Sequence, residues 1–127
     1  MDTNSFVNCC YVNIQSVGNK TVEIREFIID HQIDILAITE TWLAYGELAK
    51  IREITPDTHK FLHIPREDRR GGGVGIFISK KFLKIREVRG NKYECFEYIH
   101  ICFENHGSKY AFIILYRPPE SHFGVFF

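Results

Sequence analysis

The feature that most constrains the fold is a change of hydrophobic period near the amino terminus. Val7–Ile14 is mostly apolar and is followed by turn-forming residues. Over Lys20–Gln32, apolar side chains recur at the spacing of one helix face, whereas Ile33–Thr39 is almost wholly apolar. So short an apolar run is typical of a central strand covered on both faces. Strand, helix and strand in this order predict a layered α/β domain.

The rest of the chain has mainly strand composition. A short helix is predicted at Leu48–Ile54, and Pro56 ends it. Five later segments are rich in β-branched and aromatic residues and are separated by glycine or asparagine, which predicts an antiparallel meander. These segments are His59–Ile64, Val74–Ile78, Phe82–Val88, Glu94–Glu104 and Tyr110–Tyr116. Because Tyr110–Leu115 is apolar throughout, we expect it in the centre of a sheet.

Length and composition indicate one globular domain, residues 1–127. The chain is 45% hydrophobic, yet it has neither a membrane-length apolar run nor the basic and apolar regions of a signal peptide, so we expect an intracellular protein. The four cysteines have no zinc-site spacing. Cys95 and Cys102 lie on one strand and cannot pair with each other. We therefore expect reduced thiols, buried or half-buried.

The formal net charge of zero conceals an uneven distribution. Arg66–Lys92 holds nine Lys or Arg against three acidic residues, and the remainder of the chain is net acidic. Such a block can contact phosphates, although more often it is a solvated face. Charge alone leaves both interpretations open.

Two polar residues follow predicted strands and form a candidate site. Asn13 ends the first strand and Glu40 follows the second. Side chains at the carboxyl ends of strands in an α/β sheet converge on ligands, and a carboxylate suits Mg²⁺. Strand ends also carry such residues simply because solvent begins there, so position alone favours the structural interpretation.

The glycine-rich stretch Arg69–Gly75 does not resemble a nucleotide-binding loop. It lacks a Gly-Lys-Ser/Thr ending, and a strand instead of a helix follows it. We expect its glycines to permit a close approach between sheets or loops. Tyr116, which closes the last predicted strand, could bury its ring while its hydroxyl meets solvent or a phosphate.

Taken together, four segments resemble the endonucleases of LINE-type retrotransposons, which are members of the endonuclease/exonuclease/phosphatase superfamily. In chain order they are Asn13-Ile14-Gln15-Ser16, Ile35 to Leu43 with its Glu-Thr-Trp-Leu ending, Arg70 to Ile78 with its glycine run, and Tyr116-Arg117-Pro118-Pro119. The Glu-Thr-Trp-Leu and Tyr-Arg-Pro-Pro pieces are the most specific. The similarity extends from about Phe6 to Phe123, nearly the whole chain.

The resemblance implies a fold, a chemistry and a set of site residues. It implies a four-layer α/β sandwich, of which this chain is the amino-terminal part, that cuts DNA with bound Mg²⁺ or Mn²⁺ and leaves a 3′ hydroxyl to prime reverse transcription. By position, Glu40 resembles the metal-binding glutamate, Asn13 the asparagine beside the metal and Tyr116 the tyrosine that contacts the scissile phosphate. Arg117, Arg69 and Arg70 would hold the DNA backbone. The resemblance implies no membrane and no small-molecule cofactor, and a nuclear location for the active enzyme.

The chain departs from this family after Tyr-Arg-Pro-Pro. The family continues with Asp-x-Asn and later Ser-Asp-His, and Ser121-His122 is neither of these. The water-activating pair would then be missing and the metal would bind weakly to a single carboxylate, so we expect an inactive or nearly inactive isolated chain. Unpaired sheet edges would also favour self-association. The alternatives are a non-catalytic module that binds nucleic acid or protein, and a member of the superfamily that acts on phospholipid or another phosphoester, against which the two specific motifs argue.

Overall fold

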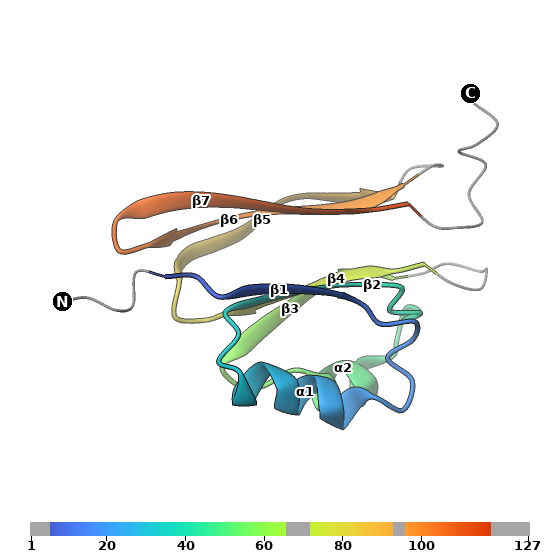
Figure 1. Cartoon of the computed structure of the whole chain (residues 1–127). Helices are drawn as coiled ribbons and strands as arrows, with labels where there is room; N and C mark the ends of the chain where they lie inside the picture. The colour runs from blue at the N-terminus through green and yellow to red at the C-terminus, as the bar shows by residue number, and fades with distance from the viewer. Residues whose placement is uncertain (1–5, 66–71, 93–95, 118–127) are drawn as a thin grey trace.

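The computed structural model describes residues 6–65, 72–92 and 96–117. It contains two helices and seven strands in an α/β arrangement, with α1 and α2 covering the outer face of one sheet and the second sheet stacked on its other face (Figure 1). The elements are β1 (Cys9–Asn13), α1 (Thr21–Asp30), β2 (Ile35–Thr39), α2 (Leu48–Ile54), β3 (His59–Ile64), β4 (Val74–Ser79), β5 (Leu83–Lys92), β6 (Glu97–Asn105) and β7 (Ser108–Tyr116). The prediction of a partial α/β sandwich is confirmed.

The first sheet has the strand order β1-β2-β4-β3. β1 and β2 are parallel because α1 carries the chain back across the sheet, whereas β4 runs antiparallel to both of its neighbours. Every residue of β2 is buried, as its apolar run predicts for a central strand. The register pairs Asn13 with Thr39, so Asn13 and Glu40 come to the same end of the sheet.

The second sheet is an antiparallel meander in the order β5-β6-β7. The antiparallel meander predicted for the second half of the chain is confirmed for β5, β6 and β7, whereas the prediction is wrong for β3 and β4, which belong to the first sheet. All six residues of β4 are buried, and a strand that is apolar on both faces is stable only inside a sheet covered on both sides. β4 accordingly lies between β2 and β3 instead of in the more open second sheet.

The central position expected for Tyr110–Leu115 is also wrong for the described residues. β7 lies at an edge of the second sheet, with Ile114 and Tyr116 buried between the sheets. Ile113 and Leu115 point to the other face and are 57% and 60% exposed. The apolar pattern of this strand fits two covered faces, and the described residues cover one of them.

Two apolar clusters hold the layers together. One fills the space between the two sheets and the other joins the first sheet to the helices. Gly75 shows how tight the packing is, because a Cβ atom there would lie 2.6 Å from the ring of Phe61. The inter-sheet cluster includes Ile35, Ala37, Ile76, Ile99 and Ile101, and the helix-side cluster includes Ile24, Ile28, Leu36, Ile54 and Phe77.

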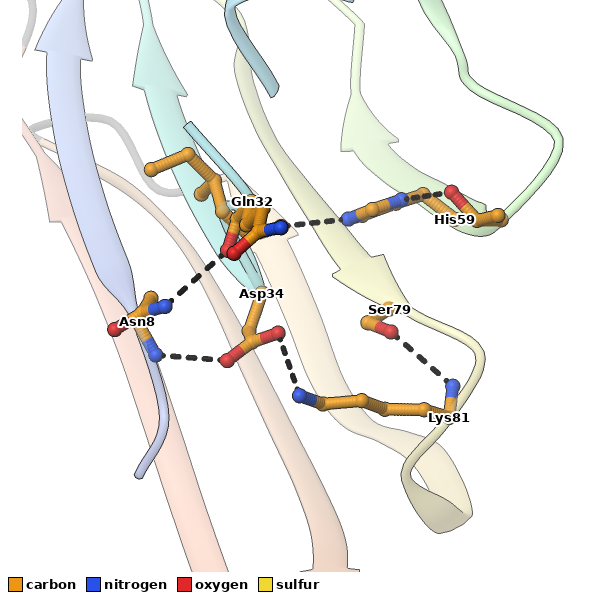
Figure 2. A network of polar contacts seen from close by, with 8 residues as sticks. Asn8, Gln32, Asp34, His59, Ser79 and Lys81 are labelled. Carbon is orange, nitrogen blue, oxygen red and sulfur yellow. Dashed lines mark hydrogen bonds and ion pairs between the residues drawn. The ribbon is translucent and has the colours of Figure 1, made fainter. Parts of the chain in front are cut away.

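A polar network closes the end of the first sheet that lies opposite Glu40 (Figure 2). The buried Asp34 carboxylate accepts a hydrogen bond from the backbone N–H of Asn8 at 2.8 Å and pairs with Lys81 Nζ at 2.9 Å. His59 Nε2 lies 2.8 Å from the carbonyl oxygen of Ile33. Lys81 belongs to the basic segment and serves this structural pair, and Lys84 likewise pairs with a glutamate, which favours the solvated-face interpretation for the described part of that segment.

The described cysteines Cys9, Cys10 and Cys102 are free thiols, whereas Cys95 lies outside the described residues. Cys9 is exposed instead of buried or half-buried, because β1 is a sheet edge. In the described ranges no helix is long and apolar enough to cross a membrane.

Candidate active site

Two side chains from strand ends converge on the carboxylate of Glu40, the residue that directly follows β2. Tyr116, which ends β7, donates its hydroxyl to Glu40 Oε2 at 2.6 Å. Asn13, which ends β1, donates its side-chain amide to the same oxygen at 2.9 Å. The structure thus brings together the three residues that the sequence predicts for the site. Both donors use Oε2, so neither of these two hydrogen bonds occupies the other oxygen, Oε1.

These contacts fix the protonation states of the site. The hydrogen bond from Tyr116, and after it the one from Asn13, hold the pKa of Glu40 below its ordinary value, so the carboxylate is ionised at neutral pH. Burial, followed by the hydrogen bond to Glu40, raises the pKa of Tyr116, which therefore stays a phenol and a donor. The buried indole N–H of Trp42 has no partner in bonding geometry among the described residues, yet it lies close enough to lower the pKa of Glu40 further.

The backbone around Glu40 is strained. Glu40 and Trp42 have φ angles of 56° and 58°, and Gln15 and Ser16, in the loop after β1, have 50° and 84°. This left-handed region is unfavourable for residues with a Cβ, and such residues cluster where surrounding structure imposes them, often at functional sites. Here the two loops hold each other, since the N–H of Ser16 donates to the carbonyl of Glu40 at 2.7 Å.

The glycine run supports the Glu40 loop from its other side. The backbone N–H of Thr41 donates to Gly73 O at 3.1 Å, and that of Trp42 donates to Gly72 O at 3.0 Å. Gly73 has a φ of +94°, and a Cβ there would collide with the Thr41 hydroxyl. The expectation that these glycines permit a close approach is confirmed at Gly72, Gly73 and Gly75, whereas Gly71 lies outside the described residues.

Two neighbours of the site were not predicted from the sequence. Glu97, at the start of β6, is 1% exposed and accepts a hydrogen bond from the Gly73 N–H at 3.0 Å. A signal for it existed, because Glu97 is in phase with the buried Ile99 and Ile101 on the inner face of its strand. Tyr11 shares a 2.8 Å hydrogen bond with the Thr39 hydroxyl. Nothing in the local pattern distinguished Tyr11 from an ordinary strand tyrosine.

Of the three arginines expected to hold DNA, the structure describes Arg117. Arg117 is exposed and directly follows Tyr116, so its backbone lies beside the site. Arg69 and Arg70 fall outside the described residues. Their proposed contacts with a DNA backbone stay predictions.

Comparison with known proteins identifies the family. The family model described as "Endonuclease/Exonuclease/phosphatase family" matches residues 8–124. The chain belongs to this endonuclease/exonuclease/phosphatase family. The match includes Asn13, Glu40 and Tyr116. A search of curated proteins found no match.

Solved structures show the same fold at low sequence identity. The AP endonuclease LMAP from Leishmania major is similar over 85% of this chain and 38% of its own, with 18% identity and a TM-score of 0.62. Truncated Caenorhabditis elegans TDP2 is similar over 87% of this chain and 46% of its own, with 17% identity and a TM-score of 0.57. The Bacteroides thetaiotaomicron mannosyl-6-phosphatase Bt3783 is similar over 87% and 51%, with 12% identity and a TM-score of 0.57. The chain thus spans about half the length of these structures or less.

The residues present fit a weakly bound divalent cation. The endonuclease/exonuclease/phosphatase family generally uses a divalent metal. Within the described ranges no group of three His, Cys, Asp or Glu could hold one. Glu40 nevertheless offers an ionised carboxylate, and the hydrogen bonds from Asn13 and Tyr116 both use Oε2 and leave Oε1 unoccupied by either of them. One or two carboxylates with waters and substrate phosphates are a common shell for Mg²⁺.

Proposed function

We propose that this chain carries part of the active centre of a Mg²⁺- or Mn²⁺-dependent DNA endonuclease of the LINE-type retrotransposon kind, acting in the nucleus. The observation that supports this most directly is the convergence of Tyr116 and Asn13 on one oxygen of Glu40. A tyrosine and an asparagine that merely ended their strands would have no reason to donate to the same oxygen of a strained glutamate. The Glu-Thr-Trp-Leu and Tyr-Arg-Pro-Pro segments around two of these residues support the retrotransposon subgroup.

The proposed reaction is hydrolysis of a phosphodiester. Water attacks phosphorus, the bond from phosphorus to O3′ breaks, and a proton passes to O3′, which leaves a 3′ hydroxyl and a 5′ phosphate. Glu40 would hold the cation, which when bound polarises the phosphoryl oxygens. Tyr116 stays protonated and Asn13 keeps its amide on Oε2, so the two donors restrain the Glu40 carboxylate through that oxygen. Arg117 would neutralise part of the DNA backbone charge.

The isolated chain is expected to cleave DNA very slowly or not at all. The isolated chain is expected to lack the water-activating pair of the endonucleases it resembles. Loss of a general base alone typically costs about 10²- to 10⁴-fold in rate. Purified chain should therefore leave supercoiled plasmid intact in Mg²⁺ over times in which a complete family nuclease nicks it. Nicking that disappears with Glu40→Gln would contradict this expectation while supporting the role of Glu40.

Metal binding can be tested without activity, because Trp42 is the single tryptophan of the chain and lies two residues from Glu40. Mn²⁺ bound at Glu40 should quench Trp42 fluorescence, and Mg²⁺ should compete. Glu40→Gln should abolish saturable quenching. Glu104→Gln is the matched control, since it makes the same chemical change near the carboxyl end of β6. It should leave quenching unchanged. Equal quenching in all three proteins would exclude a metal at Glu40.

The nucleic-acid part of the proposal needs a separate measurement. Binding of a short fluorescent DNA duplex should be strengthened by Mn²⁺ and weakened by Glu40→Gln or by EDTA. Binding that persists unchanged in EDTA and in Glu40→Gln would instead support the non-catalytic binding module. A competing sugar phosphate that displaces DNA at equal phosphate concentration would argue for a small phosphoester substrate.

A further inference from the structure

Glu97 is a buried carboxylate that the proposed reaction does not use. It stands on the inner face of β6, in phase with the apolar Ile99, Ile101 and Phe103, and is 1% exposed. Burial of a carboxylate among apolar side chains is costly unless hydrogen bonds compensate for lost water. An apolar residue would fill this position without that cost. Contacts made by the Glu97 oxygens must therefore offset this cost.

One oxygen of Glu97, on the second sheet, contacts the segment that leads into β4 of the first sheet. Oε1 accepts a hydrogen bond from the Gly73 N–H at 3.0 Å, and both atoms are buried. Oε2 occupies the space beside Gly72, where a Cβ atom would lie 3.3 Å from it. The Glu97 carboxylate thus binds the N–H of Gly73 and lies beside Gly72.

Gly72 and Gly73 in turn hold the loop that carries Glu40. Their carbonyl oxygens accept the N–H groups of Trp42 and Thr41 at 3.0 and 3.1 Å. Glu40 directly precedes Thr41 and has a left-handed backbone that its neighbours must impose. The path from Glu97 through Gly73 and Thr41 to Glu40 therefore consists of hydrogen bonds and peptide bonds only.

A second connection runs through Tyr116. Glu97 and Tyr116 are register partners on adjacent strands. Tyr116 in turn donates its hydroxyl to Glu40 Oε2 at 2.6 Å. Glu97 therefore lies next to both supports of the Glu40 carboxylate, the segment that holds its backbone and the strand end that carries its hydrogen-bond donor.

We propose that Glu97 is a positioning residue, which from the second sheet sets the orientation of Glu40 through the Gly72-Gly73 segment. This inference rests on the proposed function only for its effect on metal binding. Its structural part, restraint of the Thr41 and Trp42 backbone, holds whether or not Glu40 binds a metal.

The test uses three substitutions of Glu97 in the full chain. Glu97→Gln keeps a carbonyl acceptor for the Gly73 N–H, Glu97→Met has similar volume but no such acceptor, and Glu97→Asp withdraws the acceptor by one methylene. Ile101→Val is the control for lost stability, because it removes a buried methylene from the same face of β6 without touching Gly73.

The first readout is amide hydrogen exchange of Thr41 and Trp42 by NMR, at a temperature where every variant is folded. Loss of one hydrogen bond should accelerate both amides roughly tenfold in Glu97→Met and Glu97→Asp. Glu97→Gln and Ile101→Val should stay near wild type at these two amides. Exchange in Glu97→Met and Glu97→Asp that matches Ile101→Val would overturn the proposal, and if Met does not fold, Asp alone decides.

The second readout is the Mn²⁺ affinity reported by Trp42 fluorescence. Glu97→Met and Glu97→Asp should weaken Mn²⁺ binding roughly tenfold, whereas Glu97→Gln should largely restore it. A wild-type chain without Glu40-dependent quenching would refute the proposed metal site and leave the exchange result to judge Glu97. Intact metal affinity in Glu97→Met together with wild-type exchange would refute the positioning role alone.

Discussion

The Tyr116 hydroxyl lies 2.6 Å from Glu40 Oε2, although 76 residues separate the two in the chain. Tyr116 ends the edge strand of the second sheet, whereas Glu40 follows a central strand of the first. Apart from apolar packing, this bond and the contact from Glu97 to Gly73 connect the two sheets at the same end. The candidate site is therefore also where the sandwich is joined by polar contacts.

Tyr116→Phe should lower the free energy of unfolding by about 1 kcal/mol, because a partly exposed hydrogen bond to a charged group is lost. Urea denaturation of Tyr116→Phe, Glu40→Gln and the double variant measures the coupling between the two side chains. Tyr45→Phe is the control, since Tyr45 is 79% exposed and should show no change. Strictly additive effects in the cycle would contradict the bond.

The same bond predicts how stability depends on pH. Because the pKa of Glu40 is lowered in the folded state from its ordinary 4.5, its contribution is present above that value and is lost as pH falls through the folded pKa. Stability of the wild-type chain should therefore decline more steeply below pH 4.5 than that of Tyr116→Phe. Urea denaturation at several pH values, from neutral pH down through pH 4.5, measures how steeply the stability of each protein falls. Identical slopes for the wild-type chain and Tyr116→Phe would contradict the prediction.

Gly73→Ala should cost far more stability than Gly107→Ala. Both residues have a positive φ, +94° and +80°, so each substitution carries the left-handed penalty of about 1–2 kcal/mol. At Gly107 a Cβ meets nothing within 4 Å, whereas at Gly73 it collides with Thr41. Overpacking should add about 1–3 kcal/mol at Gly73 alone. Thermal unfolding of the two variants checks this, and equal losses would remove the argument for close approach.

His63 should make the chain less stable in mild acid. Burial lowers its pKa from the ordinary 6.5, and its buried Nδ1 has no hydrogen-bond partner among the described residues. The unfolded chain therefore binds a proton below pH 6.5 that the folded chain resists, and stability falls as pH decreases towards the folded pKa. His63→Leu should remove this slope and gain roughly 1 kcal/mol near pH 5. A slope that survives in His63→Leu would assign it to another group.

The sheet edges predict where copies of the chain would associate. β3 and β5 carry lysine or arginine, whereas β1 and the Tyr110–Tyr116 part of β7 carry no charge. Both uncharged edges lie on the same side of the sandwich (Figure 1). Uncharged edges without proline pair readily with other strands. We expect sedimentation velocity to show concentration-dependent association.

Val12→Lys should suppress that association, because it places a charge on the edge strand β1 beside an open groove of about 500 Å³ between β1 and α1. Leu83→Lys, at a 62% exposed position on the already charged β5, should not change it. A wild-type chain that stays monomeric at high concentration would show that the two edges are protected in some other way.

Local pattern predicted most of the elements. α2 and β3 have the predicted bounds, α1 and β1 differ from theirs by one or two residues at each end, and β2 begins two residues later than predicted and ends at the predicted Thr39. Their signals are strong because each buries one face or both against a neighbouring layer, and the period of apolar residues records this directly. The distribution of β3 and β4 to the first sheet was not predictable in this way, since composition does not say which strands pair.

The sequence by itself determined the strand ends at which Asn13, Glu40 and Tyr116 lie, since each residue closes an apolar run. Only the tertiary structure decided that Asn13 and Tyr116 share one oxygen of Glu40, and that Glu97 supports the glycine segment behind it. The physical reason is the separation along the chain between the residues that make each kind of contact. Hydrophobic period reflects contacts within one element, whereas these hydrogen bonds form between strands 24 to 76 residues apart and depend on how the two sheets stack.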